Sequence, residues 1–181
     1  VDLAAAIRAK TFHHVSSIAA AGLYEGVFRE DMFEEAQELG HPYFRTKHDS
    51  EAIVRDESKV PYRIYRPGIV VGHSKTGEID KIDGPYYFFS FIKKLREMLP
   101  QWMPTLGIEG GRINVVPVDF VVEAMDHIAH KPKLDHHTFH LTDPEPMRVG
   151  EVLNTFARAG HAPEMTMRID ARMFAFVPGG V

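Results

Sequence analysis

The sequence predicts an α/β protein in which helices flank a parallel sheet. Segments typical of strands, rich in β-branched and aromatic residues, alternate along the 181 residues with segments that repeat apolar residues at the spacing of one helix face. No internal repeat, low-complexity tract or flexible linker divides the chain. We therefore expect one domain over residues 1–181.

The first half of the chain predicts two helices and two strands. Residues 4–10 favour a helix, and residues 11–16 form a short β-type run that ends in serines. Pro42 suits the first turn of a helix reaching residue 55, because that turn needs no N–H donor from the residue. Residues 60–71 predict a strand that is interrupted at 66–68, where proline and glycine occur.

The second half continues the alternation. Residues 88–99 predict a helix that Pro100 ends, and residues 112–118 predict a strand after which Asp119 caps a helix reaching residue 129. A third strand is expected at 138–142 and an amphipathic helix at 149–159, ended by Gly160. The glycines between residues 107 and 111 are expected to form a turn.

Composition excludes several classes of protein. With 21 Lys and Arg against 25 Asp and Glu, the net charge is −4 and no basic run occurs, so nucleic acid is not expected as the main partner. No apolar run approaches the ~20 residues that span a bilayer, and no signal peptide is seen. Without cysteine the chain has no disulfide or thiolate metal site. We expect a cytoplasmic protein that acts on a small molecule.

Tyr43 and Lys47 form the most informative pair in the sequence. Four helical residues advance ~400°, which leaves both side chains ~40° apart on one face. A cation near a phenol favours its ionised form, and a phenol tuned in this way exchanges a proton with a carbonyl or alcohol at neutral pH. A hydroxyl that hydrogen-bonds the same substrate oxygen completes such a site, and Ser17, where a predicted strand gives way to a loop, is the candidate. Ser16 is the reserve candidate.

Together these residues resemble a known family. HVSSIA precedes YFRTK, and YRPGIVVG and NVVPVDFV follow, in the order found in the extended branch of the short-chain dehydrogenase/reductase family. This branch includes sugar-nucleotide epimerases, 3β-hydroxysteroid dehydrogenases and acyl reductases. The resemblance implies a Rossmann-like parallel sheet, NAD or NADP as cofactor, and hydride transfer between the nicotinamide and a carbonyl or alcohol carbon.

The resemblance also implies roles for single residues. Tyr43 would be the acid/base, Lys47 would tune it and hold the nicotinamide ribose, and Ser17 would orient the substrate carbonyl. The segment Pro67, Gly68, Ile69 and Val70 would lie against the nicotinamide. Arg112 stands where sugar-nucleotide enzymes often hold an arginine that binds substrate phosphate.

The sequence departs from the family pattern in two ways. The glycine-rich dinucleotide fingerprint is absent, and the first residues read as the middle of a helix. We therefore expect an incomplete Rossmann-like domain: its C-terminal half with a small substrate-binding subdomain, whose partner is the missing N-terminal half. Ala21 stands where sugar-nucleotide members often carry tyrosine. That residue and the aromatic content favour a hydrophobic ketone, aldehyde or thioester over a sugar.

Other interpretations stay open. The alternatives are a sugar-nucleotide epimerase or dehydratase of the same family, and a non-catalytic nucleotide-binding module that has kept the fold for regulation. A homodimer is compatible with the family. Histidines at 13–14 and at 136, 137 and 140 suggest a metal protein, but neighbouring strand residues point to opposite faces and no carboxylates are interleaved with the second group. We expect no metal site.

Overall fold

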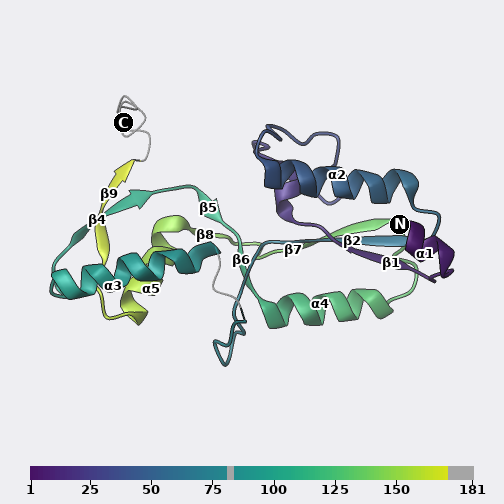
Figure 1. Ribbon diagram of the computed structural model, residues 1–181. Coiled ribbons are helices and arrows are strands. Elements are labelled where there is room, and N and C mark those ends of the chain that lie inside the picture. Colours follow the sequence, from purple (N-terminus) through teal and green to yellow (C-terminus); the bar gives the residue numbers. More distant parts are fainter. Residues whose placement is uncertain (81–83, 171–181) are drawn as a thin grey trace. The chain divides into compact units, whose positions relative to one another are not determined.

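The computed structural model describes residues 1–80 and 84–170, in which the chain forms two units (Figure 1). The first unit comprises Val1–Glu78 and Val115–Asp143. The second comprises Ile79–Asn114 and the chain from Pro144 on. No helix within the described ranges is long and apolar enough to span a membrane.

A parallel sheet forms the centre of the first unit. Its strands lie in the order β1 (Phe12–Val15), β2 (Tyr62–Pro67) and β7 (His137–Leu141). All residues of β2 are buried, as expected for a central strand covered on both faces. Next to it, β3 (Ile69–Val71) and β6 (Val115–Pro117) form a second parallel pair. The predicted parallel α/β architecture is confirmed, and so is the interruption of the strand around residue 68.

Helices cover the two faces of this sheet. Figure 1 shows α2 (Pro42–Glu57) on one side and α4 (Val118–His130) on the other. Alternation along β2 explains this arrangement: Ile64 packs with Val54 of α2, whereas Tyr65 packs with Val121 of α4. The short helices α1 (Asp2–Ala6) and η1 (Ile18–Ala21) flank β1 in the sequence.

Asp119 does not cap α4 as predicted. The helix begins at Val118, so Asp119 lies inside its first turn, and its carboxylate accepts hydrogen bonds from Ser74 N at 2.9 Å and from Ser74 Oγ at 2.6 Å. The carboxylate thus joins α4 to the loop after β3. These hydrogen bonds, first from the hydroxyl and then from the amide, lower the pKa of Asp119 to about 2.

We expect this contact to titrate with acid. Because the pKa of Asp119 is lower in the folded protein, the contact stabilises the fold above the ordinary carboxyl pKa and is lost as the pH falls through about 2. Ser74→Ala removes the hydroxyl donor and should raise this pKa toward the ordinary value. NMR titration of the Asp119 carboxyl measures both values, and an unchanged pKa in the variant would contradict the assignment.

The second unit is built on two helices and short strands. The elements of the second unit are η2 (Gly84–Tyr87), α3 (Phe88–Met98), β4 (Thr105–Glu109), β5 (Arg112–Ile113), β8 (Met147–Arg148), α5 (Val149–Ala159) and β9 (Met165–Asp170). Strand β4 pairs with β9 in parallel, and β5 pairs with β8 antiparallel. Helix α5 ends before Gly160, as predicted.

Two sequence predictions fail in this region. Residues 107–109 belong to β4 rather than to a turn. A Cβ atom at Gly107 would lie 2.6 Å from Met165 Cβ, so the glycine permits the close approach of β9. The strand expected at 112–118 is divided at Asn114 into β5 and β6, which belong to different units.

Candidate active site

The first turn of α2 carries the predicted acid/base pair. Pro42 is the first helical residue, and the His41 ring accepts a hydrogen bond from Tyr43 N at 3.2 Å, which caps the helix. Tyr43 is 48% exposed, and Lys47 Nζ lies 5.9 Å from the centroid of its ring. The phenol and the ammonium therefore share one flank of the helix.

The two candidate serines have different surroundings at the end of β1. Ser16 is 2% exposed, and its hydroxyl donates to Glu51 Oε2 at 2.9 Å. Ser17 Oγ instead accepts the N–H of Ala19 at 3.1 Å and caps η1. A hydroxyl that accepts in this way keeps its own proton to donate. The hydroxyl of Ser16 is therefore committed to Glu51. Ser17 is also buried, at 9% exposed, but its Oγ accepts within the protein and its proton is left to donate.

Two side-chain contacts hold α2 against this serine segment. One is the bond from Ser16 to Glu51, and the other joins His48 Nδ1 to Ala20 O at 3.1 Å. The helix that carries Tyr43 and Lys47 therefore packs against the segment that follows β1.

The predicted nicotinamide segment lies at the joint between β2 and β3. Pro67 and Gly68 are buried, Ile69 is partly buried, and Val70 is 40% exposed. The Gly68 amide donates to Leu141 O at 3.1 Å, so this N–H is engaged in the sheet. Of these four residues, Val70 offers the most surface to a ligand.

Arg112 lies in β5, in the second unit. Its side chain is exposed, and its Nη1 donates to Pro146 O at 2.7 Å. This bond joins β5 to the residue that precedes β8. A role in substrate binding stays a prediction for this residue.

A buried ionic cluster that the sequence did not predict contacts the serine segment and α2. Glu51 and Arg66 are fully buried and bond at 2.6 Å, and Arg55 pairs with the same carboxylate at 2.7 Å. Burial acts to raise the pKa of Glu51, but the hydrogen bonds and charges of the two arginines and the Ser16 hydroxyl hold it below its usual value. The available signal was the position of Glu51, four residues after Lys47 on the same helix.

The positions of the histidine side chains bear on the metal-site hypothesis. In the ranges that the structure describes, no group of three or more His, Asp or Glu side chains is arranged to hold a metal ion. Burial lowers the pKa values of His14 and His140, with a further lowering of the His140 pKa by the charge of Arg66. His140 Nε2 lies 3.3 Å from Arg66 Nη1, which suits a neutral ring that accepts from the guanidinium.

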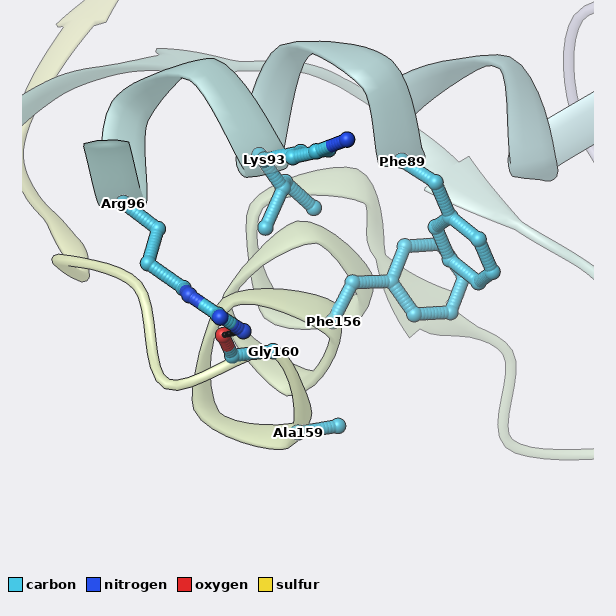
Figure 2. Close-up of a pocket in the computed structure, with 7 residues that line it drawn as sticks. Phe89, Lys93, Arg96, Phe156, Ala159 and Gly160 are labelled. Carbon is cyan, nitrogen blue, oxygen red and sulfur yellow. Dashed lines mark hydrogen bonds between the residues drawn. The ribbon is translucent and has the colours of Figure 1, made fainter. Parts of the chain in front are cut away.

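The second unit contains an open cavity of about 390 Å³ between α3 and α5 (Figure 2). Phe89 meets Phe156 edge to face, with ring centroids 5.1 Å apart. Figure 2 shows this aromatic pair on one side of the cavity and Arg96 on the other, where its Nη1 donates to Gly160 O at 3.3 Å. Part of the aromatic run at 86–91 thus packs against α5 within this unit.

Several proteins of known sequence are similar to this chain. A family profile described as male sterility protein matches residues 1–125, more than half of the chain. The chain is 31% identical over 179 residues to the nonribosomal peptide synthetase FrzA of a Cladobotryum species, which covers 90% of this chain and 17% of that protein. It is 30% identical over 148 residues to the aldehyde reductase lnbA of Aspergillus flavus, with coverages of 76% and 14%.

Solved structures show the same fold. The terminal R domain from the myxalamid PKS-NRPS biosynthetic pathway has a TM-score of 0.64 and 26% identity, over 87% of this chain and 39% of that one. MoeE5 in complex with UDP-glucose and NAD has a TM-score of 0.65 and 20% identity, over 94% and 55%. The chain thus spans a small part of the two curated relatives and about half or less of these two solved chains. It has a Rossmann-like α/β fold and belongs to the extended short-chain dehydrogenase/reductase family, a family of NAD(P)-binding proteins.

Proposed function

We propose that this chain carries the catalytic residues of an NAD(P)-dependent reductase that acts on a carbonyl or alcohol carbon. The observation that carries the proposal is the arrangement of three groups. Tyr43 and Lys47 share one flank of α2, and the Ser16–Glu51 bond holds this helix against the end of β1, where Ser17 lies. An acid/base, a cation and a hydroxyl donor are the groups that carbonyl reduction needs.

The donor set of this flank fits the nicotinamide ribose. Within the described residues Lys47 pairs with no carboxylate, so its ammonium donors are available to ribose hydroxyls. The half-exposed Tyr43 lies beside it, and Val70 supplies an exposed apolar surface at the end of the sheet. We propose that these residues hold the nicotinamide half of NAD or NADP.

In carbonyl reduction the residues of this chain would manage the proton. A bound NAD(P)H would supply the hydride to the carbonyl carbon. Ser17 would donate a hydrogen bond to the carbonyl oxygen, and the Tyr43 hydroxyl would give its proton to the same oxygen as the C–O double bond becomes single. Lys47 would stabilise the negative charge left on the phenol. An aldehyde or ketone would yield an alcohol and NAD(P)⁺, whereas a thioester would yield NAD(P)⁺ and a hemithioacetal whose C–S bond breaks to release a thiol and leave an aldehyde.

A hydrophobic aldehyde, ketone or thioester is the substrate class we propose. The name of the relative lnbA describes an aldehyde reductase. The aromatic content of the sequence also favours an apolar substrate.

The second candidate function is sugar-nucleotide epimerisation or dehydration. MoeE5 binds UDP-glucose and NAD, and its chain shares this fold. Arg112 is exposed and stands where sugar-nucleotide enzymes often hold a phosphate-binding arginine, whereas Ala21 stands where they often carry a tyrosine. Arg112 therefore favours the sugar-nucleotide alternative, and Ala21 opposes it.

A substrate panel separates these functions. The intact protein is incubated with NADH or NADPH and with long-chain aldehydes, ketones, acyl thioesters and UDP-sugars. We expect oxidation of one nicotinamide for each hydride gained by an aldehyde, ketone or thioester. Conversion of a UDP-sugar without net nicotinamide oxidation would favour the epimerase instead. Nicotinamide binding with no turnover of any compound would contradict both and favour a non-catalytic module.

A further inference from the structure

Glu51 extends the line of site residues along α2 into the interior. Tyr43, Lys47 and Glu51 are spaced by four residues, so they follow one another along a single stripe of the helix. Tyr43 is half-exposed, Lys47 is partly buried, and Glu51 is fully buried. The stripe therefore leads from the surface where a ligand would bind to a carboxylate that no solvent reaches.

Both oxygens of the Glu51 carboxylate are occupied. Oε1 accepts from Arg66 Nη2 at 2.6 Å and from Arg55 Nη2 at 2.7 Å and Nε at 3.1 Å. Oε2 accepts from Arg66 Nε at 3.1 Å and from Ser16 Oγ at 2.9 Å. Charge-assisted bonds of this kind are short and directional, so the carboxylate fixes the rotation of α2 about its axis.

Ser16 links Glu51 to the segment that contains Ser17. Its hydroxyl is a donor to Glu51, and its backbone N donates to Tyr65 O at 2.8 Å in the sheet. The next residue in the chain is Ser17. One carboxylate thus holds both the helix of Tyr43 and Lys47 and the backbone immediately before the serine that would face the substrate.

Arg66 adds the remaining segments. It immediately precedes Pro67 and Gly68, and its Nη2 donates to Met32 O at 3.0 Å while its guanidinium lies over the Phe28 ring, 5.1 Å from the centroid. The loop between η1 and α2 and the end of β2 are therefore tied to the same carboxylate.

We infer that Glu51 is a positioning residue, which through Ser16 and Arg66 sets the distance between the Tyr43 hydroxyl and the Ser17 hydroxyl. This inference rests on the proposed function. The placement of reacting groups is sensitive to small shifts, and a displacement of about 1 Å can cost about a hundredfold in rate. Tyr43 and Lys47 lie on the same helix, so a shift of α2 would leave the geometry of these two groups relative to each other intact, and we expect nicotinamide binding to change less than the rate.

Two variants test the inference in the intact protein. Ser16→Ala cuts the link between Glu51 and the serine segment and leaves both arginine pairs. Glu51→Gln keeps the size of the side chain and removes its charge. The readout is the single-turnover rate of hydride transfer per bound nicotinamide, together with the KM for the nicotinamide. A variant that merely unfolds in part loses binding sites and turnover in proportion, so this normalised rate would stay constant.

We expect the rate per bound nicotinamide to fall about tenfold in Ser16→Ala and about a hundredfold in Glu51→Gln, with the KM for the nicotinamide changing by much less than the rate. If Glu51→Gln does not fold, Ser16→Ala alone decides the matter. The matched control is Asp135→Asn, which removes the charge of the carboxylate that pairs at 3.0 Å with the buried Arg63 of β2, and it should leave the rate unchanged.

Tyr43→Phe, measured in parallel, separates failure of the inference from failure of the proposed function. A wild-type rate in Ser16→Ala together with an inactive Tyr43→Phe would overturn the positioning role and leave the reductase proposal standing. Full turnover in Tyr43→Phe would overturn both.

Discussion

Tyr43→Phe should abolish nearly all turnover and leave nicotinamide binding in place. The substitution removes one oxygen from a side chain that is 48% exposed, so the fold and the Lys47 contact with the ring are retained. General acid catalysis typically contributes about 10² to 10⁴ in rate, and we expect kcat to fall by that factor. Steady-state kinetics with the preferred carbonyl substrate, alongside nicotinamide affinity by fluorescence, measure the two quantities.

The matched control is Tyr87→Phe. Tyr87 is 70% exposed and lies in the second unit, outside the predicted site, so loss of its hydroxyl should leave kcat at the wild-type value. If Tyr43→Phe behaves like Tyr87→Phe, Tyr43 is not the acid of the reaction.

Arg66→Met should cause the largest loss of stability among single substitutions in the ionic cluster. Arg66 and Glu51 are both fully buried, and removal of one partner leaves a buried carboxylate with less compensation. Breaking a buried pair in this way costs about 3 to 5 kcal/mol in the free energy of unfolding. Arg55 remains bonded to Glu51, which places the expected loss toward the lower end of this range. Urea or thermal unfolding of the intact protein measures it.

An exposed ion pair on α2, the helix that carries Glu51, provides the comparison. Arg45 and Asp49 lie 3.8 Å apart with side chains that are 73% and 60% exposed. Surface pairs contribute about 0 to 1 kcal/mol, so Arg45→Met should change stability little. Equal losses in the two variants would show that burial of the Glu51–Arg66 pair is not what stabilises this region.

Much of the fold follows from local sequence patterns. The run of aromatic and β-branched residues around Ile64 predicts β2, and Pro42 predicts the start of α2, because each signal lies within one element. Strands β4 and β9 gave no such signal. Gly107 lowers the strand propensity of β4, and its use becomes clear only when Met165, far along the chain, packs against it.

Some features of the candidate site could likewise be predicted from the sequence, and others could not. The pairing of Tyr43 with Lys47 follows from one helical turn, and Ser17 follows from the end of a strand. The spacing of Glu51 from Lys47 places it on the same helix stripe, but its burial against Arg66 could not be predicted, because charged side chains in a sequence are expected at the surface. Only the parallel pairing of β1 with β2 brings Arg66 beneath α2, where the carboxylate and the guanidinium neutralise each other.

The most direct test is a crystal structure of the intact protein with bound nicotinamide and a carbonyl compound that cannot be reduced. We predict that the Tyr43 hydroxyl and Ser17 Oγ both lie within hydrogen-bonding distance of the carbonyl oxygen, with Lys47 Nζ on the ribose. A carbonyl oxygen held by other residues, with Tyr43 directed to solvent, would contradict the proposed reductase.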